Sequence, residues 1–219
     1  MKTLLFSQSY YLFSLLSLVV FLLATKVKKG RYIILFLYIT TIAFLAYFYR
    51  IPDRRCGANH TDIENKANKD NITSPADGTI MNIYQREDSK KVITIFLSIF
   101  DVHVQYIPYS GQIVDRKYKK GNFHPAFMFK KSERNEKSMI KINTDRGVIE
   151  VDQIAGLVAS RIVTDPQIGD QVRRGDIYGM IKLSSRVDLT LPENVEILVK
   201  EGDKVTGCET VMAKFIWFF

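Results

Sequence analysis

Two nearly uncharged apolar segments near the N-terminus restrict the possible folds of this chain more than any other feature. They cover residues 4–24 and 32–49. An α-helix rises about 1.5 Å per residue, so about 20 residues cross a hydrocarbon core of roughly 30 Å. The first segment is long enough, and the second spans only with a thinner bilayer or little tilt. The basic turn 26–31 separates them, so the pattern predicts a transmembrane helical hairpin over residues 1–49.

A hairpin places Met1 and the remainder of the chain on the same side of a membrane. The positive-inside rule does not choose that side, because four basic residues lie in the turn and four flank the other ends of the segments. A secretory signal is disfavoured, since a second apolar segment follows at once. The expected location is therefore a membrane, with its orientation open.

Composition predicts one globular domain after a polar linker at 50–71. The 219 residues are 47% hydrophobic and 25% charged, with a formal net charge of +8. Attraction to anionic lipid fits this charge, although a solvated face explains any single basic cluster equally well. We expect no nucleic-acid partner, because the basic residues form no recognisable binding pattern. Two distant cysteines and three histidines predict neither a disulfide framework nor a metal site.

The pattern of apolar and β-branched residues after residue 72 predicts short β-strands. Residues 92–97 are β-branched and apolar, and 139–143 and 148–151 form a hairpin pattern around a turn. Gly-Asp-x-Val occurs twice, at 169–172 and 202–205, and is similar to the turns of lipoyl-like barrel-sandwich domains. No lysine stands in a tight turn to carry lipoate or biotin. The predicted fold class is mainly β, a barrel-sandwich or lipoyl-like domain with an N-terminal transmembrane helical hairpin.

Three separated segments supply a carboxylate, an imidazole and a hydroxyl. They are Asp77 in Ser-Pro-Ala-Asp-Gly, His103 in Phe-Asp-Val-His-Val, and Ser185 in Leu-Ser-Ser-Arg-Val. A serine at its free pKa is a poor nucleophile, and a base oriented by a third group activates it. Each residue alone has a structural explanation: Asp77 as a turn former, His103 as a satisfied core histidine, and Ser185 as an ordinary strand residue.

Together these segments resemble the phosphatidylserine decarboxylases, in the short form with an apolar anchor. The resemblance runs from about Tyr47 to Phe215. It also includes an aromatic-Arg entry at 48–54, Glu-Arg-Asn at 133–135 and Gln-Ile-Ala-Gly at 153–156. It implies a catalytic domain over 72–219 and the decarboxylation of phosphatidylserine to phosphatidylethanolamine.

The resemblance further implies self-cleavage between Ser184 and Ser185. The Ser185 hydroxyl attacks the Ser184 carbonyl carbon while His103 takes its proton, and Asp77 holds the resulting imidazolium. The amide becomes an ester, and β-elimination frees a chain ending at Ser184. The dehydroalanine left at position 185 takes up water and releases ammonia to become a pyruvoyl group. This covalent cofactor accepts the electrons left by carbon dioxide, and the large and small chains stay associated.

Two positions depart from the family pattern. Ser184 replaces the usual glycine, which tolerates strained backbone angles and lets a nucleophile approach closely; we expect it to slow cleavage. Long-form relatives carry a second histidine where this chain has Tyr106, which leaves open which proton transfers His103 serves.

Other functions also fit the sequence. Archaetidylserine carries the same head group on ether chains, and the chemistry never touches the tails. A non-catalytic membrane-tethered β-domain adaptor is favoured by Ser184. An export accessory protein would combine an anchor with a lipoyl-like domain, but no heptad repeat is present.

Overall fold

The protein forms two compact units, Met1–Pro52 and Asp53–Phe219, called here the helical unit and the β unit. The structure, a computed structural model, describes residues 14–23, 26–27, 30–54, 69–121, 135–156, 162–181 and 185–216.

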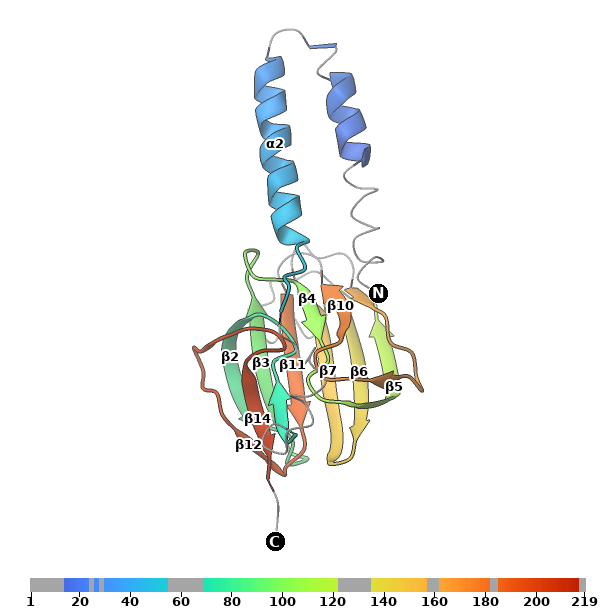
Figure 1. The fold of residues 1–219 in the computed structure, drawn as a ribbon, viewed down its shortest axis with the longest axis vertical. Coiled ribbons are helices and arrows are strands. Elements are labelled where there is room, and N and C mark those ends of the chain that lie inside the picture. The colour runs from blue at the N-terminus through green and yellow to red at the C-terminus, as the bar shows by residue number, and fades with distance from the viewer. Residues whose placement is uncertain are drawn as a thin grey trace. The chain divides into compact units, whose positions relative to one another are not determined.

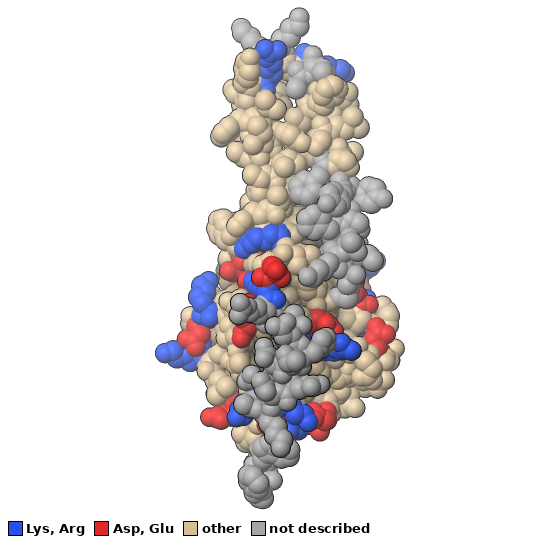
Figure 2. Space-filling view, viewed as in Figure 1, with Lys and Arg blue, Asp and Glu red and all other residues tan. Residues whose placement is uncertain are grey.

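The helical unit contains α2 (Arg31–Phe48) and a shorter apolar helix over Ser14–Leu23. Helix α2 begins after Gly30, whose φ of 91° suits a residue without a Cβ. At 18 residues it is long and apolar enough to cross a membrane, and most of its large side chains are exposed. Figure 2 shows the visible face of this unit almost without charge between its ends. An apolar helix predicted over 32–49 is thereby confirmed.

The β unit is built on one large antiparallel sheet (Figure 1). Its eight strands lie in the order β13-β2-β3-β11-β7-β6-β5-β9. Their bounds are β2 (Gly78–Gln85), β3 (Lys91–Leu97), β5 (Gly111–Lys119), β6 (Lys137–Thr144), β7 (Gly147–Ala155), β9 (Gln171–Val172), β11 (Ser185–Leu191) and β13 (Lys204–Val205).

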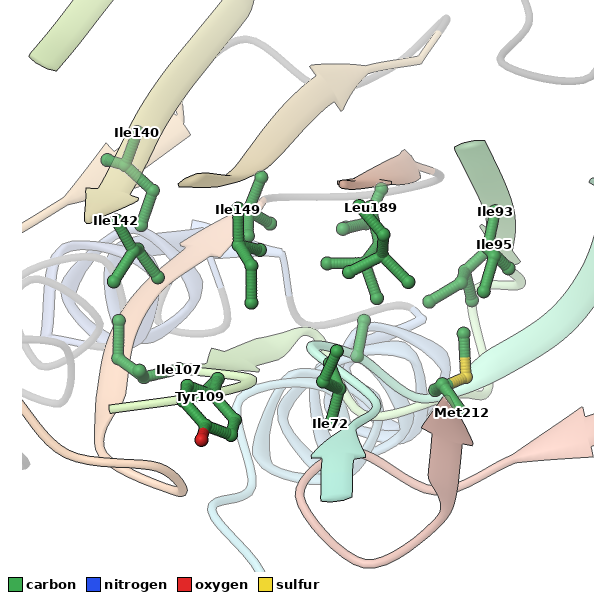
Figure 3. Close-up of a cluster of buried hydrophobic side chains, with 14 of the residues drawn as sticks. Ile72, Ile93, Ile95, Ile107, Tyr109, Ile140, Ile142, Ile149, Leu189 and Met212 are labelled. Carbon is green, nitrogen blue, oxygen red and sulfur yellow. The ribbon is translucent and has the colours of Figure 1, made fainter. Parts of the chain in front are cut away.

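Two three-stranded sheets lie against this large sheet, in the orders β1-β14-β12 and β4-β10-β8. Their strands are β1 (Asn71–Thr73), β4 (Val104–Tyr106), β8 (Ile162–Thr164), β10 (Ile177–Ile181), β12 (Val195–Ile197) and β14 (Val211–Phe215). Figure 3 shows side chains from both layers meeting in one core, with Ile93 and Leu189 facing Ile72 and Met212. The mainly β fold class is confirmed.

The predicted strands come from residues that suit a pleated, buried surface. Residues 92–97 lie in β3, and the expected hairpin is formed by β6 and β7, with Thr144 paired to Gly147. β-branched side chains favour such strands because they pack well on the pleat. Alternation then directs every second residue of each central strand into the core between the layers.

The two Gly-Asp-x-Val repeats form equivalent turns at opposite edges of the large sheet. The Asp170 carboxylate accepts the Gln167 N–H at 2.8 Å, and the Asp203 carboxylate accepts the Lys200 N–H at 2.9 Å. Each turn leads into a two-residue edge strand, β9 or β13. The repeated sequence motif therefore forms the same turn at both positions.

Gly78 is predicted to be essential for packing β2 on β3. Its φ is +152°, and a Cβ there would lie 2.2 Å from the backbone oxygen of Phe96. Gly78→Ala combines strain with a backbone clash and should cost more than about 3 kcal/mol. The control Gly169→Ala has φ +100° and nothing within 4 Å, so only strain of about 1–2 kcal/mol applies. Thermal unfolding in detergent measures both; equal losses would contradict the clash.

Candidate active site

Ser185 is the first residue of β11, the strand between β3 and β7. It pairs with Leu97 on one side and Ala155 on the other. The residue is fully buried, and its Oγ has no hydrogen-bond partner among the described residues. Buried hydroxyls are normally hydrogen-bonded, so this hydroxyl is a candidate reactive group.

The chain changes sheets immediately before Ser185. Strand β10 ends at Ile181 in a small sheet, and β11 begins at Ser185 in the large one. Residues 182–184 come between these two strands in the sequence. Ser184, and with it the predicted cleavage bond, lies outside the described residues, so the effect of serine in place of glycine stays a prediction.

His103 lies just before β4, beside the end of β10. Its carbonyl oxygen accepts the backbone N–H of Ile181 at 3.3 Å. The imidazole is completely buried. The structure therefore places the His103 segment next to the strand that runs into the crossing and on to Ser185.

The tautomer of His103 follows from one contact. Nδ1 lies 2.9 Å from the carbonyl oxygen of Asp101. A carbonyl only accepts, so Nδ1 carries the proton and the lone pair of the neutral ring is on Nε2. Nε2 is thus the atom able to take a proton from a hydroxyl.

A short turn connects the strand partner of Ser185 to His103. The Ser98 N–H donates to the Asp101 carboxylate at 2.7 Å, and the Asp101 N–H donates to the Ser98 carbonyl at 3.0 Å. Asp101 closes the turn with its side chain and orients His103 with its carbonyl. Sequence reasoning missed this role, although Asp101 is in the quoted motif.

Asp77 is held by Arg54. The guanidinium donates to both carboxylate oxygens, at 2.5 and 2.6 Å, and the Gly207 N–H donates at 2.8 Å. No hydrogen bond or ion pair joins Asp77 to His103 among the described residues. Stabilisation of a His103 imidazolium by Asp77 therefore stays a prediction.

Arg54 is the residue of the candidate site that the sequence indicated least. It appeared only at the end of the aromatic-Arg segment, without a role. Burial alone would lower the pKa of its guanidinium, but the hydrogen bonds and charge of Asp77 hold that pKa above its ordinary value. Arg54 also lies over the Tyr106 ring, 5.5 Å from the centroid. Burial raises the pKa of the Tyr106 hydroxyl, which keeps it protonated.

The turn that binds Asp77 also carries a disulfide, which the sequence did not predict. Cys208 follows Gly207, has φ 62°, and is disulfide-bonded. The only other cysteine in the sequence is Cys56, which lies outside the described residues. A lone cysteine in a turn carries no local signal of a disulfide, which explains the error.

Arg186, next to Ser185, points to the opposite face of β11 and forms a mostly buried ion pair with Asp188 at 2.9 Å. Burial raises the pKa of the Asp188 carboxyl, while Arg186 opposes that rise.

Within the described parts of the chain, no three His, Cys, Asp or Glu side chains gather as metal ligands.

We predict that Arg54→Gln destabilises the β unit by about 3 kcal/mol, because it leaves the mostly buried Asp77 carboxylate without its cation. Lys117→Gln is the control, since Lys117 pairs with Asp115 but is 70% exposed, and such pairs contribute at most about 1 kcal/mol. Urea unfolding of the full chain in detergent compares them. Indistinguishable midpoints would show that Arg54 does not hold Asp77.

Comparisons with known proteins identify the family. The family model for phosphatidylserine decarboxylase matches residues 41–213. A phosphatidylserine decarboxylase proenzyme of Syntrophotalea carbinolica is 41% identical over 209 residues, covering 92% of this chain and 90% of the relative. The corresponding proenzyme of the Wolbachia strain from Brugia malayi is 37% identical over 214 residues, covering 93% and 88%. A Methanosarcina barkeri protein, provisionally named an archaetidylserine decarboxylase proenzyme, is 39% identical over 170 residues, covering 78% and 76%. The chain belongs to the phosphatidylserine decarboxylase family.

Proposed function

We propose that this protein decarboxylates phosphatidylserine to phosphatidylethanolamine with a pyruvoyl group made by self-cleavage before Ser185. The observation that carries the proposal is the placement of Ser185. Its hydroxyl is buried without a partner among the described residues, and the His103 segment lies beside the strand leading to it. A serine is activated when a base comes within hydrogen-bond reach of its hydroxyl, and this placement supports His103 as that base.

The geometry supports a role for each residue. The Ser185 hydroxyl is the nucleophile, and Nε2 of His103 takes its proton because Asp101 occupies Nδ1. Asp77, fixed by Arg54 and Gly207, supplies negative charge near Tyr106.

The fold is suited to a cut before β11. Every residue of β11 is buried, and the strand pairs on both sides. Cleavage between 184 and 185 removes only the backbone nitrogen of residue 185 and leaves the pairings from Arg186 onward, so the small chain keeps the central strand of the large sheet. This supports large and small chains that stay associated.

The site also fits a pyruvoyl group. The orphaned Ser185 Oγ shows that a buried polar atom is accommodated there without a competing partner among the described residues. The pairing of β11 with β3 and β7 would hold the group in place, and its carbonyl would supply the electron sink for decarboxylation.

A lipid substrate agrees with the anchor and with the turn beside the site. Helix α2 has the length and composition of a span, and Ser17 Oγ lies 2.5 Å from Tyr38 OH on it. This supports a helical hairpin in residues 1–49, a membrane location and a linker over 50–71.

The stacked sheets with their repeated edge turns support a barrel-sandwich arrangement of 72–219.

The turn between Leu97 and His103 exposes two adjacent apolar side chains. Ile99 is 40% and Phe100 63% exposed. A phospholipid head group that reaches Ser185 leaves its tails in the bilayer, so the turn next to Ser185 must come close to that surface. Apolar side chains there gain free energy by entering the interface.

Two alternatives remain testable. Archaetidylserine offers the same head group, and the Methanosarcina barkeri relative favours it; assays with ether and ester lipids distinguish the two substrates. A non-catalytic adaptor would remain a single chain.

Self-cleavage is tested by intact mass. Purified full-length protein should yield chains of 184 and 35 residues, since 219 − 184 = 35, the smaller with a blocked N-terminus. Ser185→Ala should give one chain, because no hydroxyl remains, whereas Ser185→Cys keeps a nucleophile and should cleave slowly. A wild-type chain that stays whole after prolonged incubation would overturn the proposal.

The exposed turn gives a second test. Phe100→Ser should raise the KM for phosphatidylserine in vesicles about tenfold, because interfacial burial of a Phe side chain is worth roughly 1.5–3 kcal/mol. Self-cleavage should be unchanged. Ile168→Ser is the control, since Ile168 is 63% exposed at a different turn. Equal KM values for the two variants would contradict docking through this turn.

A further inference from the structure

A line of four buried polar side chains ends at the backbone carbonyl of His103. The side chains come from four different strands and are nearly inaccessible. In order towards His103 they are Ser138 on β6, Thr164 on β8, Gln153 on β7 and Gln105 on β4.

Each contact in the line is short. Ser138 Oγ lies 2.8 Å from Thr164 Oγ1, which lies 2.6 Å from Gln153 Oε1. Gln153 Nε2 lies 2.9 Å from Gln105 Oε1. Gln105 Nε2 then lies 2.7 Å from the His103 carbonyl oxygen.

The direction of every hydrogen bond follows from the last acceptor. The His103 carbonyl accepts from the Gln105 amide, so the Gln105 amide oxygen faces Gln153 and accepts in turn. The Gln153 oxygen must then accept from Thr164, whose hydroxyl accepts from Ser138. All donors therefore point towards His103, and bonds aligned in this way in a low-dielectric interior strengthen one another.

The line connects the two layers of the fold beside the candidate nucleophile. Gln153 is paired with Val187, two residues after Ser185 on the same face of β11. Gln105 belongs to the small sheet that carries His103. Gly179 leaves room for the Gln153 side chain between the two layers. A Cβ at Gly179 would lie 2.9 Å from Gln153 Nε2 and 2.2 Å from the Val163 oxygen.

We propose that Gln105, Gln153 and Thr164 are positioning residues, which set the His103 segment relative to Ser185 by bridging the two sheets. None of them touches the reacting atoms. The inference rests on the proposed function, because it assigns them to the activation of Ser185 by His103. The reason is physical: removal of one member leaves the next buried group unpaired, and that group reorients to recover a bond.

The first experiment measures the first-order rate of self-cleavage by intact mass in full-length protein. Thr164→Val removes the hydroxyl at nearly constant volume and should slow cleavage tenfold or more. Thr164→Ser keeps the hydroxyl and should restore the rate to within about threefold of wild type. Gln105→Glu serves as a second variant, because it still accepts from Gln153 but cannot donate to the His103 carbonyl.

The matched control is Thr144→Val. Thr144 Oγ1 donates to the Gly147 carbonyl and accepts the Arg146 N–H in the β6–β7 turn. It should lower the unfolding temperature comparably but leave the cleavage rate unchanged. If Thr164→Val slows cleavage no more than Thr144→Val, or if Thr164→Ser fails to rescue it, the inference is overturned.

A second readout does not require cleavage. Nitrogen-15 NMR of histidine-labelled Ser185→Ala protein, with His103 assigned by loss of its signal in His103→Gln, reports which ring nitrogen carries the proton. We expect protonation at Nδ1 alone, and a mixture of tautomers once Thr164→Val is added. An unchanged His103 signal in the added variant would overturn the inference even if the wild-type chain never cleaved.

Discussion

The structure depends on the burial of one strand, β11. All seven of its residues are buried, and it forms antiparallel pairs with β3 and β7 along nearly its whole length. Because β11 is buried on both faces and pairs on both edges, its neighbours in the sheet fix its position and register. Ser185 is its first residue, so the candidate nucleophile is fixed by the most buried part of the protein.

Two separate devices hold the remaining candidate groups. Asp101 closes the turn after β3 and fixes the His103 ring through its carbonyl. Arg54 holds Asp77 by a bidentate ion pair, and the Gly207 N–H donates a third hydrogen bond to the same carboxylate. The Asp101 contacts are local, whereas those of Asp77 reach Arg54, 23 residues before it, and Gly207, 130 residues after it. A site of this kind requires the whole β unit to be folded, which agrees with chemistry that starts only after folding is complete.

The sequence predicted the strands well, because strands leave local signals. The β-branched run at 92–97 and the alternating hairpin at 139–151 reappear as β3, β6 and β7. Pairing partners left no such signal. Nothing in the order of residues indicated that Arg54 binds Asp77, that Asp101 orients His103 through a backbone atom, or that Cys208 is in a disulfide. The Arg54–Asp77 contact and the disulfide depend on tertiary packing, and the Asp101 contact depends on the conformation of a turn that the residue types do not specify.

The polar residues of the core show the same limit. Gln105 and Gln153 were recognisable as parts of motifs, but a buried amide in a motif does not indicate its partner. The register of β7 against β11 places Gln153 beside Val187, and the pairing of β4 with β10 brings Gln105 to the same place. Strand register, rather than local propensity, assembles this line of hydrogen bonds.

The most direct test of the central claim is a decarboxylation assay with phosphatidylserine labelled at the head-group carboxyl carbon. The cleaved wild-type protein in mixed micelles should release labelled carbon dioxide and leave phosphatidylethanolamine, and prior treatment with a carbonyl reagent such as phenylhydrazine should abolish the release. Labelled carbon dioxide that still appears from the uncleaved Ser185→Ala protein, or none from a fully cleaved wild-type protein, would contradict the account.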